Sequence, residues 1–298
     1  MTVYEIVTAR IVDLLQQGTI PWRKPWRADA GEPRNLTSGK PYRGINVFLL
    51  STMPFASPYW LTYRQATERG GSVRKGSKGT PVVFWRWNKP GAQGQGSEEQ
   101  SGTDEKADTS HRRGAPLLRY YTVFNVEQCE GIEAPAATVR TFEPIAECEH
   151  IVSAMPKPPR IEHHGAQAFY RPSSDTVVTP RPELFDSPGL YYSVLFHELT
   201  HSTGHESRLA RKGITDAAMF GSHEYSREEL VAEMGAAFLC GTAGIDAATL
   251  QDSTAYLANW IKTLRGDSRL VVTAAAQSQK AADLILGRVA EPQLAAVA

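Results

Sequence analysis

The sequence has few cysteines and no long hydrophobic run, and each absence excludes a class of protein. Only three cysteines occur among 298 residues, and none has the spacing of a zinc knuckle or a redox pair. No stretch approaches the roughly 20 consecutive apolar residues that a membrane-spanning helix needs. The N-terminal stretch also lacks the apolar core of a secretory signal. We therefore expect a protein of the reducing cytoplasm without a membrane partner.

The chain as a whole has no net charge, although its first and last parts are charged oppositely. The formal net charge is zero. Residues 1–90 nevertheless hold 14 Lys and Arg against 5 Asp and Glu, whereas residues 161–298 hold 11 against 16. A basic first part joined to an acidic second part predicts that only the first part contacts a polyanion.

The length favours two domains, since an average domain has roughly 150 residues. Strand-like and helix-like patterns alternate irregularly along the chain, which predicts an α+β fold. We expect a small, basic, aromatic-rich α+β domain over residues 1–135, a linker over 136–159 and a second domain over 160–298. Residues 88–114 contain no large apolar side chain, so this stretch is expected to be a disordered insertion in the first domain.

The second half contains a metal-ligand pattern, HELTH, at residues 197–201. Ser187 and Pro188 predict the start of a helix, on which His197 and His201 project from the same face. Two such histidines bind one Zn²⁺, and Glu198 then faces the water in the open coordination position as a general base. The pattern predicts metal-assisted hydrolysis, although five residues of this kind also arise by chance on surface helices.

The next predicted helix offers two candidates for the third metal ligand. Glu229 and Glu233 lie one turn apart, so one can bind the metal while the other supports a ligand histidine. Ser226 and Glu229 also fit a capping box, which would leave Glu233 as the ligand. The spacing resembles that of zincins in which the first glutamate binds zinc, which favours Glu229. Zn²⁺ is the expected cofactor, and other divalent transition metals fit the same ligands.

The first 90 residues hold five of the six tryptophans, interleaved with lysine and arginine. Exposed aromatic rings stack on unpaired bases while cations follow the backbone, so single-stranded DNA is the expected partner. Signals of a double-helix reader, such as a recognition helix or a zinc finger, are absent from the sequence. The candidate DNA contacts are Trp22, Arg23, Lys24, Trp26, Arg27, Arg43, Lys75 and Lys78. The alternative is a tryptophan core with a solvated cationic face, which is favoured for Trp60, Trp85 and Trp87.

Four segments together resemble plasmid antirestriction proteins of the ArdC type. They are YEIVTARIVDLLQQGTIPWRKPW, NLTSGKPYRGINVFLL, HELTHSTGHESRL and YSREELVAEMGAAFLCG, and the match covers nearly the whole chain. The resemblance implies an N-terminal domain that binds single-stranded DNA and a C-terminal zincin-like metallopeptidase domain. It also implies protection of incoming conjugative plasmid DNA from host restriction, with possible transfer of the protein into the recipient cell.

Two functions remain open at this point. The first is a zinc peptidase that cuts a restriction subunit or another DNA-bound protein, as SprT-like proteases do with a third histidine in place of Glu229 or Glu233. The second is a protein that coats single strands and keeps the zincin fold for structure. For a peptidase, the extended run at residues 176–179 is either an edge strand that aligns a peptide or a plain core strand.

Overall fold

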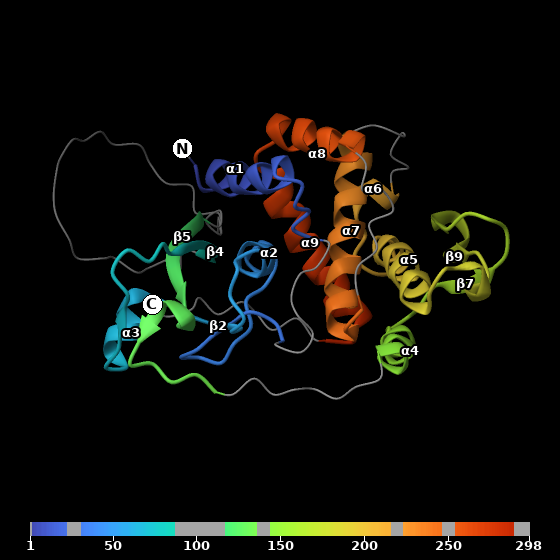
Figure 1. Cartoon of the computed structure of the whole chain (residues 1–298). Coiled ribbons are helices and arrows are strands. Elements are labelled where there is room, and N and C mark those ends of the chain that lie inside the picture. Colours follow the sequence, from blue (N-terminus) through green and yellow to red (C-terminus); the bar gives the residue numbers. More distant parts are fainter. Residues whose placement is uncertain are drawn as a thin grey trace, which may run out of the picture.

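The computed structural model describes residues 2–22, 31–86, 117–135, 144–215, 223–245 and 254–288. The expected insertion at residues 88–114 and the first part of the expected linker, residues 136–143, lie outside these ranges. Helices and short strands are mixed along the chain, which confirms the expected α+β class (Figure 1). None of the described helices is long and apolar enough to span a bilayer.

The N-terminal part, described here up to residue 135, combines three helices with two small sheets. Thr2 and Glu5 form a capping box that starts the first helix. The helices are α1 (Val3–Gln16), α2 (Ile45–Ser51) and α3 (Tyr63–Glu68). A four-stranded sheet has the order β1 (Arg34–Asn35), β2 (Tyr59–Leu61), β5 (Leu117–Asn125) and β4 (Thr80–Arg86). A second sheet pairs β3 (Ser72–Val73) with β6 (Cys129–Glu130).

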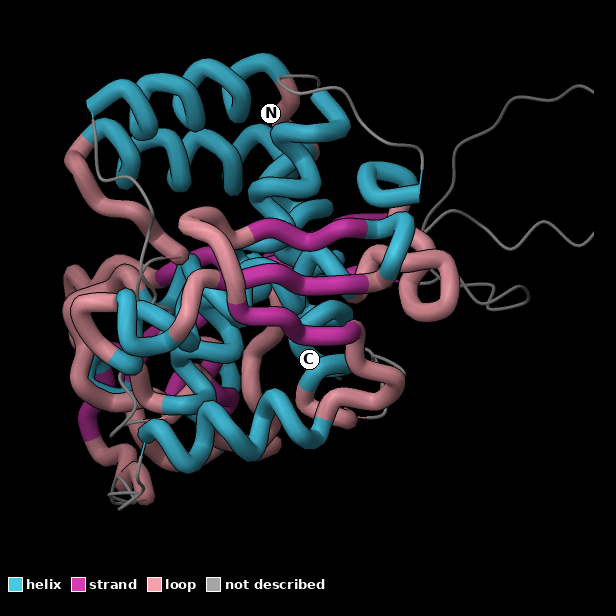
Figure 2. Tube along the Cα trace, turned by 90° about the vertical axis from the view of Figure 1, so that its right-hand side faces the viewer, coloured by secondary structure: helices cyan, strands magenta, loops and turns pink. Residues whose placement is uncertain are grey.

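The C-terminal part, described from residue 144 onward, places one three-stranded sheet against a group of helices (Figure 2). The strands are β7 (Arg160–His163), β8 (Phe169–Arg171) and β9 (Thr176–Thr179). The helices are α4 (Pro144–Ala154), α5 (Pro188–Ser202), α6 (Lys212–Thr215), α7 (His223–Ala243), α8 (Thr254–Gly266) and α9 (Leu270–Ile285).

Strand β9 lies between the other two strands, parallel to β7 and antiparallel to β8. All four of its residues are buried. The edge-strand interpretation of residues 176–179 is therefore wrong, because both hydrogen-bonding edges of β9 are already used. This strand is a core strand on which α5 packs.

The two parts share one hydrophobic core. Helix α7 packs against α5 and α9, while α1 packs against α8 and α9, as Figure 1 shows for α1 and α8. Phe48 of α2 stacks on Phe238 of α7 with ring centroids 4.9 Å apart. Thr8 of α1 donates a hydrogen bond of 2.7 Å to the Ser268 carbonyl before α9. The core of the N-terminal part therefore includes side chains of α7 and α9.

Candidate metal centre

Helix α5 carries the histidine pair and is held in place along nearly its whole length. Ser187 caps it by accepting a hydrogen bond of 3.2 Å from the Leu190 amide, and Pro188 occupies the first turn. Its side chains are buried from Tyr191 onward except at His197, which is partly exposed. The helix is thus a rigid core element that presents His197 at the rim of the site.

Helix α7 approaches α5 closely enough to bring a carboxylate to the histidines. The two helices are in close contact at Gly235, where an added Cβ would lie 2.4 Å from Cγ2 of Thr200 on α5. Glycine is required here because any side chain would push the two helices apart. This contact fixes the distance between Glu229 on α7 and the histidines on α5.

Three side chains meet in a geometry that suits a metal ion. The Nε2 atoms of His197 and His201 are 3.1 Å apart. In the carboxylate of Glu229, Oε2 lies 3.6 Å from Nε2 of His197 and Oε1 lies 3.6 Å from Nε2 of His201. Tetrahedral zinc with bonds of ~2.0–2.1 Å holds its ligand atoms ~3.3 Å apart, so the spacing fits. The group contains Glu229, whereas Glu233 is not part of it.

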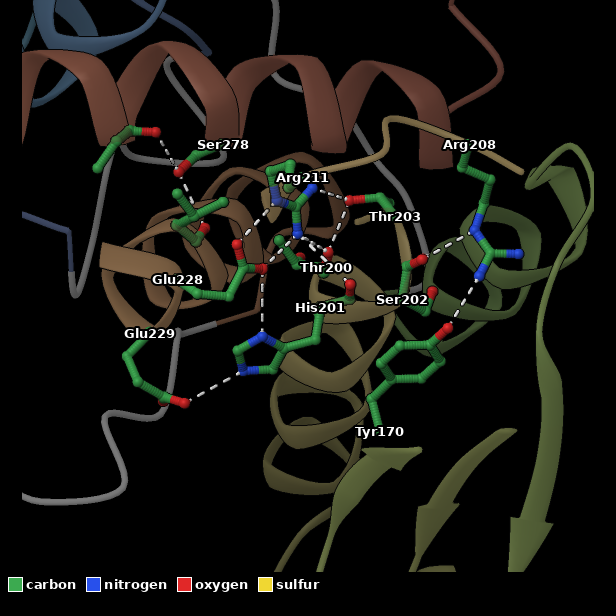
Figure 3. A network of polar contacts seen from close by, with 12 residues as sticks. Tyr170, Thr200, His201, Ser202, Thr203, Arg208, Arg211, Glu228, Glu229 and Ser278 are labelled. Carbon is green, nitrogen blue, oxygen red and sulfur yellow. Dashed lines mark hydrogen bonds and ion pairs between the residues drawn. The ribbon is translucent and has the colours of Figure 1, made fainter. Parts of the chain in front are cut away.

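His201 is supported from behind by a buried ion pair (Figure 3). Its Nδ1 lies 3.4 Å from Oε1 of Glu228, which leaves Nε2 directed at His197 and Glu229. Nε of Arg211 donates to Oε2 of Glu228 at 2.9 Å. A carboxylate behind a ligand histidine fixes the ring and its tautomer. The sequence predicted Glu233 as the carboxylate that supports a ligand histidine; behind His201 this position is taken by Glu228, whereas the charge interaction of Glu233 is with His197.

The loop after α5 is fastened by two arginines. Arg211 also donates to the Thr200 carbonyl at 2.8 Å, near the end of α5. Arg208 donates to the Ser202 carbonyl at 2.8 Å and to Asp175 at 2.9 Å. The end of the histidine helix is therefore connected both to α7 and to the sheet. Arg208 lies within the quoted segment HELTHSTGHESRL and Arg211 just after it, but no spacing in the sequence indicated the role of either arginine.

The electrostatics of the metal-free site favour an anionic Glu229. Burial acts to raise the pKa of Glu229, but the hydrogen bond from His197 and the charge of His201 outweigh it and lower that pKa to about 2. Burial acts to lower the pKa of His201, but the surrounding carboxylates, Glu228 first, raise it to about 9. The site therefore keeps the carboxylate ionised, as a metal ligand must be.

Glu198 and Tyr225 are two further residues that interact with the three proposed ligands. Glu198 is buried with 6% exposure, and its charge acts on His201. Tyr225 lies one turn before Glu229 on α7 and is hydrogen-bonded to that carboxylate. Burial, followed by the charge of Glu229, raises the pKa of Tyr225 to about 12, so its hydroxyl stays protonated. Sequence analysis missed Tyr225, although its spacing of four residues from Glu229 could have indicated it.

Trp22 does not have the exposed position expected for a DNA contact. Its side chain is only 1% exposed. Its Nε1 donates a hydrogen bond of 2.7 Å to Oε2 of Glu233, and the Tyr256 hydroxyl donates to the same oxygen. The DNA-stacking assignment of Trp22 is wrong because the ring is enclosed in the shared core. The indole N–H of Trp22 instead satisfies the partly buried carboxylate of Glu233 on α7, a partner that the local sequence does not reveal.

The other candidate DNA contacts have different outcomes. Arg43 is ion-paired with Asp283 of α9, but its side chain is 38% exposed, so its DNA contact stays a prediction. Lys75 and Lys78 are exposed on the turn between β3 and β4. Two exposed rings of the N-terminal part were not predicted, Tyr63 with 61% and Tyr120 with 51% exposure. Trp60 is buried, whereas Arg23, Lys24, Trp26, Arg27 and Trp87 lie outside the described residues.

Comparison with protein families identifies both parts of the chain. Residues 1–124 match a family described as the N-terminal domain of the anti-restriction factor ArdC. Residues 146–277 match a family described as zincin-like metallopeptidase. The second range contains His197, His201 and Glu229.

Solved structures and curated proteins agree with these matches. The Mn(II)-bound crystal structure of antirestriction ArdC protein from plasmid R388 is 35% identical, with a TM-score of 0.73 over 96% of this chain and 98% of that chain. Its metal-free structure is 36% identical with a TM-score of 0.72 over 96% and 97%. Uncharacterized protein y4eC of Sinorhizobium fredii is 35% identical over 94% of this chain and 90% of its own length. DNA primase TraC of Escherichia coli is 37% identical over 95% of this chain, which spans only 27% of the primase.

Proposed function

The chain belongs to the ArdC family of antirestriction proteins, and on that basis we propose that it protects incoming conjugative plasmid DNA from host restriction. We further propose that the N-terminal part binds single-stranded DNA and that the zincin-like part is a peptidase acting on a restriction or other DNA-bound protein. The observation that carries the peptidase proposal is the group of His197, His201 and Glu229, with Glu198 beside it. The three buried cysteines form no disulfide, which supports the proposal that the protein acts in the cytoplasm of the donor or recipient cell.

His197, His201 and Glu229 are the residues that would hold the cofactor, for which we propose Zn²⁺. The Mn(II) in the R388 protein indicates that other divalent metals suit such a site. A bound metal of this kind supplies Lewis-acid activation of water and polarises the scissile carbonyl. Glu198 accepts the proton that the attacking water loses and delivers it to the leaving nitrogen. The protonated hydroxyl of Tyr225 is a hydrogen-bond donor near Glu229 and Glu198.

Metal content is the first test of this proposal. We expect the purified protein to contain one equivalent of divalent metal per chain, measured by inductively coupled plasma mass spectrometry. A His197→Ala, His201→Ala variant should lose this metal because two of three ligands are gone, while its affinity for single-stranded DNA stays within about twofold. A metal-free wild type, or a variant with full metal content, would contradict the assignment of the centre.

A second variant decides whether hydrolysis is needed for antirestriction. Glu198→Gln removes the general base but none of the three proposed ligands, so metal content should be unchanged. We expect its protection of transferred plasmid DNA to fall to the level of the double-histidine variant. Protection at the wild-type level would favour the alternative function, in which the protein coats DNA and the zincin fold is retained for structure.

Single-stranded DNA binding is proposed for the exposed cationic and aromatic surface of the N-terminal part. Lys75 and Lys78 lie on the turn that precedes β4, and Tyr63 and Tyr120 are exposed rings of the same part. Cations that contact phosphates release counterions, and exposed rings stack on bases. All four side chains are exposed in the folded protein and can therefore contact a DNA strand.

Removing the two lysines should weaken DNA binding in a salt-dependent way. For Lys75→Ala, Lys78→Ala we expect lower affinity for an oligo(dT) strand. Each phosphate contact contributes about 0.7 to the slope of log affinity against log salt, so the slope should become shallower by about 1.4. Lys262→Ala, Arg265→Ala, two exposed cations of α8, is the matched control. Equal slopes for both double variants would exclude this turn from the DNA site.

A further inference from the structure

A partly buried polar cluster, formed by Trp22, Glu233 and Tyr256, lies next to Glu229 on α7 and has no part in the chemistry described so far. Nε1 of Trp22 donates to Oε2 of Glu233 at 2.7 Å, and the Tyr256 hydroxyl donates to the same oxygen. The three residues come from three segments that are distant in sequence: the segment after α1, helix α7 and helix α8. The cluster therefore joins the N-terminal part to the helix that supplies the glutamate ligand.

Glu233 interacts electrostatically with two of the three ligands. It follows Glu229 by one turn of α7, so both carboxylates project from the same side of the helix. Burial raises the pKa of Glu233, and the charge of Glu229 adds to this, while Tyr256, His197 and Trp22 act in the opposite direction. The orientation of the Glu233 carboxylate consequently affects the field at both His197 and Glu229.

The two donors hold Glu233 in one orientation. A carboxylate that is partly removed from water, as that of Glu233 is, costs free energy unless donors satisfy it, and apolar side chains of similar size would stabilise the core at least as well. Here both donors converge on a single oxygen. The donors are themselves held by Trp260, whose ring packs edge-on against Trp22 at 6.1 Å and against Tyr256 at 6.3 Å. Such a rigid arrangement indicates positioning rather than core filling.

We propose that Trp22 and Tyr256 are positioning residues for the metal ligands and act through Glu233. A residue of the N-terminal part, Trp22, then supports the metal ligands of the C-terminal part through Glu233. This inference rests on the proposed function, because it requires that His197, His201 and Glu229 bind a metal. By thermodynamic linkage, metal binding also strengthens the packing of the segment after α1 against α7.

The test replaces one donor and measures the metal directly. Trp22→Phe removes the N–H group but keeps an aromatic ring in the core. We expect its affinity for Zn²⁺, measured by competition with a chromogenic chelator, to fall by about 3- to 10-fold. Tyr256→Phe should act in the same direction, and Glu233→Gln should cost about 10-fold or more, as is usual for residues that support metal ligands. The visible absorption spectrum of the Co(II)-loaded protein should change in all three variants.

A matched control separates positioning from loss of stability. Phe48→Leu disturbs the stack with Phe238, which joins the N-terminal part to the same helix α7 but does not involve Glu233. Its melting temperature should fall while its Zn²⁺ affinity and Co(II) spectrum stay those of the wild type. Wild-type Zn²⁺ affinity and an unchanged Co(II) spectrum in Trp22→Phe would overturn this inference but not the proposed function. The same holds if Phe48→Leu lowers the Zn²⁺ affinity as much as Trp22→Phe does. A wild type without metal affinity would instead overturn the proposed function.

Discussion

Replacing Arg211 by methionine is expected to lower the free energy of unfolding by about 3–5 kcal/mol at pH 7.5, since it leaves a buried carboxylate without its partner. Arg211 and Glu228 are 9% and 6% exposed, so water cannot take the place of the guanidinium. Urea unfolding followed by circular dichroism measures the difference. A loss of less than about 1 kcal/mol would mean that Glu228 finds another partner and that the ion pair is not essential.

The pH dependence of this difference has a defined sign. Burial acts to raise the pKa of Glu228, but the hydrogen bonds from Arg211 and His201 outweigh it and lower that pKa. The pair therefore stabilises the wild type above the unfolded-state pKa of about 4.3 and loses this effect as the pH falls through the lower folded-state pKa. The gap between the two proteins should therefore persist from pH 7.5 down to about pH 4.3 and narrow below it, as Glu228 of the wild type becomes protonated.

A double variant separates stability from ligand support. In Arg211→Met, Glu228→Leu both charges are absent, so most of the lost stability should return. His201 would still lack its carboxylate, and Zn²⁺ affinity should remain about 10-fold or more below that of the wild type. Full recovery of metal affinity in the double variant would show that Glu228 does not orient His201.

Gly235→Ala is expected to destabilise the protein by about 1–3 kcal/mol, although alanine is the better helix former. The added methyl group would meet Thr200 at 2.4 Å for Cγ2 and 2.8 Å for Oγ1. Thr200 is fully buried and its hydroxyl donates to the Phe196 carbonyl, so it cannot rotate away. Because the helices must separate, Glu229 moves away from the histidines. Metal affinity should fall together with the melting temperature.

Two further substitutions check this explanation. Gly266→Ala, at the end of α8, meets no atom within 4 Å and should be neutral or stabilising. Thr200→Ser removes the methyl group that is in closest conflict and should restore part of the stability and metal affinity of Gly235→Ala. If Gly235→Ala melts at or above the wild-type temperature, the close helix contact does not limit the site.

The sequence predicted those residues of the site that can be recognised from their spacing along a helix. HELTH and the two glutamates one turn apart depend on helix periodicity, and the α+β class follows from element patterns. Glu228 was missed because its role depends on the angle between α5 and α7, and Arg211 because it lies in a loop. Trp22 was assigned to the surface because its neighbours are basic and proline-rich. Its actual partner, Glu233, is 211 positions away, and local patterns carry no information about such a contact.

Because the two parts share one hydrophobic core, they are not two structurally independent domains. The domain boundaries proposed from the sequence remain useful for describing two chemistries, one with DNA and one with a metal. Yet Trp22 and Phe48 from the N-terminal part are packed in the same cluster as Phe238 and Val271 from the C-terminal part. Removal of either part would expose apolar surface on the other, so experiments on the intact chain are the more reliable test of both activities.

The packing of α1 against α8 and α9 has a consequence during synthesis. The contact between Thr8 and Ser268 spans 260 positions, so this partner of α1 is made long after α1 itself. At about 5–20 residues per second, the ribosome takes roughly 13–50 s to produce that stretch. Until then α1, whose Ile11 and Leu15 are 0% and 1% exposed in the finished fold, lacks its packing against α8 and α9. The nascent helix α1 is thus expected to be a binding site for a ribosome-associated chaperone.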